Sequence, residues 1–206
     1  MVVQSLPVSI QTYMISHQGI MIYFPQIKGL TDEFIQQTIN QSIYRATLNL
    51  IQRQHVEQDV AVFAEMLGMY EIKTNERSVL SLVLTNYAIA SNYANGLTRF
   101  EAMTFDLTSG KQYELNDLFQ PESDYVHQLS AHIRQQLSER DIPVLNSFEA
   151  IQPDQDFYIA DKTIVLFFQP LTITPHYVGA PMFPIPIYKL ESIIPHDGLL
   201  ARLAAS

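Results

Sequence analysis

Residues 34–50 carry apolar side chains three and four positions apart, and this spacing constrains the fold more than any other feature of the sequence. Side chains at such intervals share one face of an α-helix, so the pattern predicts a helix that buries one face against another layer. Thr31 is the expected N-cap, and Asp32 and Glu33 follow it at the positive end of the helix dipole. The polar residues 52–60 are expected to form a loop or a frayed helix end. The apolar positions are Phe34, Ile35, Ile39, Ile43, Ala46 and Leu50.

A second helix is predicted for residues 123–139, where apolar side chains again recur at helical spacing. Ser123 is the expected N-cap, and Asp124 lies in the first turn. Residues 115–119 resemble a short helical turn, which Pro121 ends.

Strand-like runs surround both helices. Pro25 is expected to end the second run. Prolines at positions 181, 184 and 186 remove ladder donors, so residues 181–187 are expected to form an edge strand or an extended arm. The order of elements predicts an α+β fold, in which an antiparallel sheet has its helices packed on one side. The predicted strands are residues 8–15, 20–24, 69–74, 79–88, 100–107, 157–160 and 163–169.

Two parts of the chain are expected. Residues 1–75 contain the strand–strand–helix part, and residues 76–206 contain the antiparallel sheet with the second helix. The two form either small lobes, divided near residues 75–95, or one closely packed domain.

The charge of the chain narrows the classes of partner. The 206 residues include 21 acidic and 12 basic side chains, giving a formal net charge of −9. Nucleic-acid binding needs clustered Lys and Arg, so we expect no nucleic-acid partner, while a basic protein is electrostatically favoured. With no cysteine in the chain, disulfides and zinc–thiolate sites are excluded.

No segment of the sequence is typical of a membrane protein. The densest apolar run, residues 164–168, is far shorter than the roughly 20 residues of a spanning helix. Residues 1–7 lack a basic stretch followed by an apolar one, so we expect no signal peptide. We therefore expect a soluble chain whose oligomeric state the sequence leaves open.

Several segments resemble a tandem of bacterial domains of unknown function, here called PdaC/RsiV-like. That tandem occurs in a lysozyme-sensing anti-sigma factor and beside the catalytic domain of a peptidoglycan deacetylase. The resemblance implies the accessory fold and a cell-envelope setting, whereas a native N-terminus would imply the cytoplasm. Asn95 stands where the family often has His, so a titratable role there is not expected. The matching segments are residues 22–27, 104–111 with 115–119, 156–159 with 164–169, and 174–179 with 183–186.

Two loops are the predicted ligand-binding residues. Asn92, Tyr93 and Asn95 lie between two strands, and His176 and Tyr177 precede the proline-rich arm. Tyrosine offers contact area at low entropic cost, and amides both donate and accept hydrogen bonds, so these residue types suit sugar or protein recognition. The alternative is that they only build turns.

Catalytic and metal chemistry has weaker candidates. Asp124 and His127 lie three residues apart in the second helix, where they share a face, and His132 points elsewhere. Asp124 and His127 thus supply two candidate ligands, whereas a catalytic zinc site needs three protein ligands. The carboxylates of Asp154 and Asp156, or of Glu114 and Asp117, could pair for glycoside chemistry, but Asp154 and Asp156 fit turns better. His55, Glu57 and Asp59 are expected to be exposed in a loop.

The sequence therefore predicts a non-enzymatic binding module that uses neither metal nor cofactor. Its expected partner is a peptidoglycan-type glycan or a basic protein such as lysozyme. The alternatives are a stand-alone carbohydrate esterase or deacetylase, and a structural, self-associating protein of the cell interior.

Overall fold

The computed structural model describes residues 6–205, and the chain divides between Gln112 and Tyr113 into two compact units. The expected division near residues 75–95 falls inside the first unit, because the strands on both sides of residues 77–78 pair along their length. The prediction about a signal peptide concerns residues 1–7, most of which lie outside the described residues.

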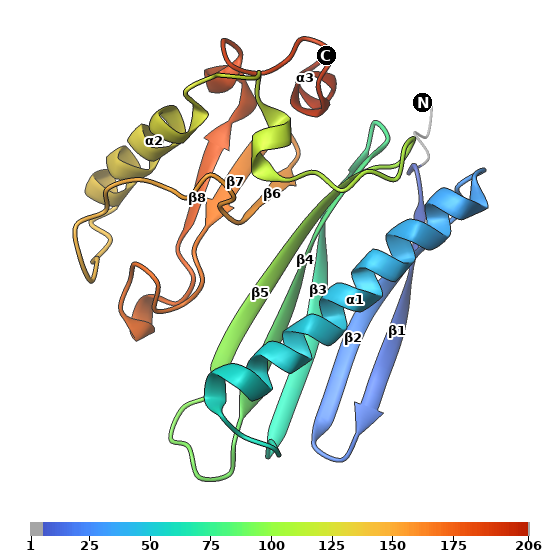
Figure 1. Cartoon of the computed structure of the whole chain (residues 1–206), viewed down its shortest axis with the longest axis vertical. Coiled ribbons are helices and arrows are strands. Elements are labelled where there is room, and N and C mark those ends of the chain that lie inside the picture. Colours follow the sequence, from blue (N-terminus) through green and yellow to red (C-terminus); the bar gives the residue numbers. More distant parts are fainter. Residues whose placement is uncertain (1–5, 206) are drawn as a thin grey trace, which may run out of the picture. The chain divides into compact units, whose positions relative to one another are not determined.

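The first unit is a five-stranded sheet with one long helix (Figure 1). The strands lie in sequence order, and neighbours run antiparallel except for β2 and β3, which are parallel over Ile20–Ile22 and Met66–Gly68. A parallel pair requires a crossover connection, which α1 provides. The elements are β1 (Ser9–His17), β2 (Ile20–Lys28), α1 (Glu33–Gln58), β3 (Glu65–Glu76), β4 (Val79–Ile89) and β5 (Leu97–Asp106).

Helix α1 lies across one face of this sheet (Figure 1). Its predicted apolar stripe is confirmed in the middle of the helix, where Ile39, Ile43 and Leu50 are buried. The stripe was wrong for Phe34 in the first turn, which is 78% exposed. The stripe packs against Leu80, Leu82 and Leu84 of β4 together with Met103 and Phe105 of β5.

Three predicted boundaries in this unit were wrong. The N-cap is Asp32 rather than Thr31, because its side chain accepts bonds from the amides of Phe34 and Ile35 at 2.9 and 3.1 Å. Helix α1 continues to Gln58. Strand β2 passes through Pro25, and this is tolerated because the pairing with β3 ends before it, as on an edge strand.

The second unit contains a three-stranded antiparallel sheet in the order β6-β7-β8. The predicted hairpin with its two-residue turn and the proline-containing edge strand are both confirmed. Helix α2 lies beside β8 (Figure 1), and it begins after Asp124 rather than Ser123. The elements are η1 (Leu115–Leu118), α2 (Tyr125–Glu139), β6 (Phe157–Ala160), β7 (Thr163–Phe167), η2 (His176–Val178), β8 (Met182–Pro186), η3 (Ile187–Leu190) and α3 (Leu199–Ala204).

The α+β class is confirmed, with one correction to the sheet: it is not one antiparallel sheet but a mixed five-stranded sheet and a separate three-stranded one. Within residues 6–205, every helix is too short or too polar to cross a membrane.

Candidate functional site

The C-terminal end of α1 meets three connections at one end of the first sheet: the β1–β2 turn, the α1–β3 connection and the β4–β5 loop (Figure 1). Hydrogen bonds between main-chain atoms join these segments. The amide of Met66 donates to the carbonyl of Gly19 at 2.8 Å, and the amide of Ala64 donates to the carbonyl of Ile89 at 2.9 Å. The helix itself ends at Asp59, whose left-handed backbone has a φ of 51°. These contacts hold segments that are far apart in sequence at the same end of the first sheet.

A pocket of about 630 Å³ opens between the β1–β2 turn and the α1–β3 connection. We call it the His17–His55 pocket. Its volume lies in the range of small-molecule sites. The lining has histidine, amide and apolar side chains and no carboxylate, lysine or arginine. The lining residues are His17, Gln18, Gly19, Ile20, His55, Ala61, Val62, Phe63 and Ala64.

The imidazole of His55 is held in place on two sides. Its Nδ1 lies 2.9 Å from the carbonyl oxygen of Val60, and its ring centroid lies 4.9 Å from that of Phe63. A carbonyl only accepts, so Nδ1 carries the proton and Nε2 is the acceptor atom of the neutral ring. The prediction that His55, Glu57 and Asp59 are exposed in a loop was wrong for His55, which lies half-buried in the last turns of α1. Glu57 is exposed as predicted, but it too lies in α1 and not in a loop.

Gly19 brings the β1–β2 turn against the α1–β3 connection. Its φ is +74°, and a Cβ atom at this position would lie 2.8 Å from the carbonyl oxygen of Ala64. A side chain is therefore excluded both by backbone conformation and by the close approach of main-chain atoms. Gly19 thus allows the β1–β2 turn to lie directly against the α1–β3 connection, and both segments line the pocket.

The predicted loop residues Asn92, Tyr93 and Asn95 are all exposed at the same end of the sheet. The hydroxyl of Tyr93 donates to the carbonyl of Gln58 at 2.9 Å, so the loop is tied to the end of α1, yet the residue keeps 41% exposure. A Cβ atom at Gly96 would lie 2.3 Å from the ring of Tyr87, which closes the base of the loop.

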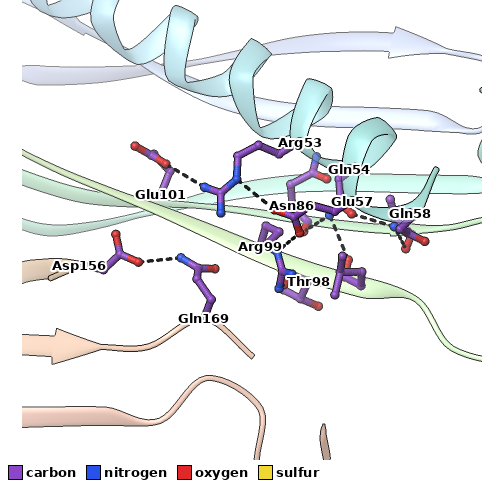
Figure 2. Close-up of polar contacts among 12 residues, drawn as sticks. Arg53, Gln54, Glu57, Gln58, Asn86, Thr98, Arg99, Glu101, Asp156 and Gln169 are labelled. Atoms are coloured by element: carbon purple, nitrogen blue, oxygen red, sulfur yellow. Dashed lines mark hydrogen bonds and ion pairs between the residues drawn. The ribbon is translucent and has the colours of Figure 1, made fainter. Parts of the chain in front are cut away.

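Behind this end of the sheet, α1 contacts β4 and β5 through buried amides (Figure 2). The Nε2 of Gln54 donates to the carbonyls of Asn86 and Leu97, both at 3.0 Å. The Nε2 of Gln58 donates to the Oε1 of Gln54 at 2.8 Å and to the carbonyl of Ala88 at 3.1 Å. We call Gln54, Gln58 and Asn86 the amide seam.

The amide seam is not fully satisfied. Gln54 is 0% exposed, Gln58 is 7% exposed and Asn86 is 1% exposed. The Oε1 of Gln58 and both polar side-chain atoms of Asn86 have no hydrogen-bond partner. Buried polar atoms without a hydrogen-bond partner cost free energy. The bonds of Gln54 and Gln58 therefore stabilise the contact between α1 and the sheet, whereas the unpaired atoms of Asn86 and Gln58 destabilise it.

An ion-pair chain runs along the outside of the same region (Figure 2). Arg53 contacts Glu57 at 3.4 Å and Glu101 at 3.5 Å, and Arg99 pairs with Glu57. These side chains are partly exposed, so solvent screens the pairs and each contributes little to stability. Glu57 is thus a structural partner of two arginines.

The predicted residues of the second unit lie on its surface. His176 and Tyr177 belong to η2, and Tyr177 is 79% exposed. Gly179 ends this turn with a φ of 74°, and its carbonyl accepts a bond from the Thr174 hydroxyl at 3.3 Å. The structure places these two residues in a different unit from Asn92, Tyr93 and Asn95.

The candidate metal ligands on α2 form an open surface pair. His127 Nδ1 lies 3.5 Å from a carboxylate oxygen of Asp124, with side chains 69% and 73% exposed. His132 lies apart, in a pocket of about 130 Å³ beside β8; burial lowers its pKa, and Lys189 lowers it further. Among residues 6–205, no three His, Asp or Glu side chains are grouped as metal ligands.

The candidate carboxylates have structural partners. Glu114 and Asp117 form a capping box at η1, in which the Glu114 amide donates to Asp117 at 3.0 Å. Asp156 accepts a bond from the Nε2 of Gln169 at 2.9 Å. Burial raises the pKa of Tyr125, and the nearby carboxylate of Asp154 adds to the effect.

Sequence reasoning missed the β1–β2 turn and the α1–β3 connection as parts of a site. A lone His beside Gln and Gly, and a short Ala-Val-Phe-Ala segment, carry no motif. Gly19 was the one available signal, because a glycine between two strand patterns marks a tight turn.

Residues 116–188 match a family model described as a protein of unknown function, DUF3298. This segment lies in the second unit and covers roughly a third of the chain. No curated protein matches.

Two crystal structures share the fold. A DUF3298 family member from Bacteroides fragilis superposes with a TM-score of 0.71 at 11% identity, covering 98% of this chain and 99% of that one. A DUF3298 family protein from Pseudomonas aeruginosa gives 0.65 at 14% identity, covering 98% of each chain. The chain is thus similar in fold to DUF3298 family members over nearly its whole length, and its second unit contains the segment that matches the family model.

Proposed function

We propose that this protein is a non-enzymatic binding module whose His17–His55 pocket, with the neighbouring Asn92–Gly96 loop, binds an uncharged saccharide of a cell-envelope glycan. The observation that carries the proposal is the pocket itself. It is concave, has a volume suited to one or two sugar rings, and lies at the end of the sheet that also presents Tyr93 and the two exposed amides.

The chemistry of the pocket favours a neutral ligand. Sugar hydroxyls both donate and accept hydrogen bonds, and the amide of Gln18 and the imidazoles of His17 and His55 offer both senses. Val62, which is 78% exposed, and Phe63 supply apolar surface for the C–H face of a ring. The pocket lining contains no carboxylate, lysine or arginine, so it offers a charged ligand no opposite charge.

The resemblance to PdaC/RsiV-like proteins supports a cell-envelope setting, since that tandem occurs in a lysozyme-sensing anti-sigma factor and beside the catalytic domain of a peptidoglycan deacetylase. The same resemblance and the net charge of −9 support a basic protein such as lysozyme as the alternative partner. The uncharged lining of the pocket favours the glycan.

Calorimetric titration tests the proposal. Oligosaccharides of N-acetylglucosamine, muropeptides and C-type lysozyme are each titrated into the full chain. We expect heat from a saccharide ligand, and Ala61→Arg, which fills the pocket from an exposed position, is expected to weaken that affinity by at least about tenfold. Ala131→Arg makes the same change on exposed α2 and should bind as the unchanged protein does.

Three results would contradict the proposal. The first is the absence of heat with every saccharide, and the second is saccharide binding that Ala61→Arg leaves unchanged. The third is binding of lysozyme alone, which would favour the alternative partner.

A further inference from the structure

Strand β1 is an open edge of the first sheet (Figure 1). Seven of its nine residues are exposed and the other two are half-buried. It pairs with β2 over all nine positions without a register shift. Its sequence, SIQTYMISH, contains no proline, lysine, arginine or carboxylate. A regular, uncharged edge of this length is a template for pairing with another strand.

The other sheet edges are protected against such pairing. Strand β5 carries the charged residues Arg99 and Glu101, β8 carries Pro184 and Pro186, and β6 is four residues long. Charges, prolines and short length are the devices by which natural sheets avoid edge-to-edge association. Strand β1 alone among these four edges has none of them.

Apolar side chains lie beside this edge on both faces of the sheet. Tyr13 is 40% exposed and Met14 is 52% exposed, and successive side chains of a strand point to opposite faces. Tyr23, opposite Met14 in the β1–β2 ladder, and Met21, opposite Ser16, are 40% and 43% exposed. A strand added to β1 would therefore be covered by apolar contacts above and below.

We propose that β1 pairs antiparallel with β1 of a second copy of this chain, forming a symmetric dimer with one continuous sheet. A second copy fits this edge because its β1 carries no charged side chain: two β1 strands meet without juxtaposed like charges, although the chain as a whole carries −9. The strand also suits a two-fold axis at Tyr13. Tyr13 of each copy then lies opposite its equivalent, and Met14 of each lies opposite Thr12 of the other.

Sedimentation velocity on the full chain, across a wide concentration series, tests the dimer. The unchanged protein is expected to dimerise, and Met14→Lys is expected to shift it to monomer because it places like charges close together at the edge. Met69→Lys is the matched control, since Met69 is 57% exposed on β3, away from the edge. It should leave the dimer intact.

Single-cysteine crosslinking adds a direct test, because the chain has no other cysteine. Opposed residues of antiparallel strands have Cα atoms about 4.5–5.5 Å apart, which a disulfide can span. Tyr13→Cys should form a disulfide-linked dimer much faster than Met69→Cys under mild oxidation.

The proposal fails if the chain is a monomer at every concentration or if Met14→Lys leaves the dimer intact. It also fails if Met69→Lys dissociates the dimer, or if Met69→Cys crosslinks as fast as Tyr13→Cys, since either result would place the contact on the sheet face. Circular dichroism of each variant confirms that its fold is retained.

Discussion

Replacing Gln54 by leucine should destabilise the protein although it puts an apolar side chain into a fully buried position. Gln54 is 0% exposed, donates to the carbonyls of Asn86 and Leu97, and accepts from Gln58. Leucine removes all three bonds and leaves two carbonyls and one amide hydrogen without these partners.

The expected loss follows from the number of bonds. A typical intramolecular hydrogen bond contributes about 1 kcal/mol net, and stranding its buried partner costs about 1–3 kcal/mol. Three bonds therefore predict a fall in the free energy of unfolding of about 3 kcal/mol. The transfer of leucine from water to the interior offsets only part of this loss, because the stranded carbonyls and amide keep their desolvation cost.

Urea titration followed by circular dichroism measures this change. Gln52→Leu is the matched control, because Gln52 is exposed on the same helix, and we expect it to stay within about 0.5 kcal/mol of the unchanged protein. If Gln54→Leu proves as stable as Gln52→Leu, the hydrogen bonds of the amide seam do not hold α1 and the reasoning is refuted.

Three further predictions use the same structure. Asn86→Leu should raise the free energy of unfolding by about 1–3 kcal/mol in the same titration, since both polar side-chain atoms of Asn86 are buried without partners; a loss would contradict this. Gly19→Ala should lower the melting temperature more than Gly29→Ala, because both have positive φ but only Gly19 faces a carbonyl oxygen at 2.8 Å; equal effects would refute the close approach. His132 has a lowered pKa in the folded state, so the unfolded chain binds more protons below about pH 6.5. Stability should fall as the pH drops through that region, and His132→Gln should show a smaller fall in urea titrations at pH 7 and pH 5; an unchanged fall would exclude His132 as the cause.

Local pattern was enough to predict most elements of the fold. The apolar spacing from Ile39 to Leu50 requires only that one helix face meet a sheet, and the structure has this contact. The same logic correctly placed β8 at an edge, since Pro184 and Pro186 lack the donors that a central strand needs.

Predictions failed where distant residues decide the outcome. Residues 52–58 look polar enough for a loop, yet the amides of Gln54 and Gln58 find carbonyls on β4 and β5, more than 29 positions away along the chain. The pairing of β2 with β3 is likewise set by the α1 crossover and leaves no trace in either strand's pattern.

The candidate site was predictable only in part. The exposure of Asn92, Tyr93 and Asn95 follows from their turn chemistry, and the structure places them at the surface. The pocket itself depends on a long-range bond between Gly19 and Met66 and on the return of α1 to the same edge of the sheet. Sequence spacing contains neither fact.

The amide seam has a mechanical consequence for the pocket. Apolar contacts, such as those in the middle of α1, allow a helix to slide or rotate slightly, because they have no preferred direction. The bonds of Gln54 and Gln58 are directional, so the last turns of α1 have one rotational setting relative to β4 and β5. His55 lies between these two glutamines in sequence. For the proposed binding function, one wall of the His17–His55 pocket is therefore preorganised, and adjustment to a ligand is left to the β1–β2 turn and the exposed segment around Val62.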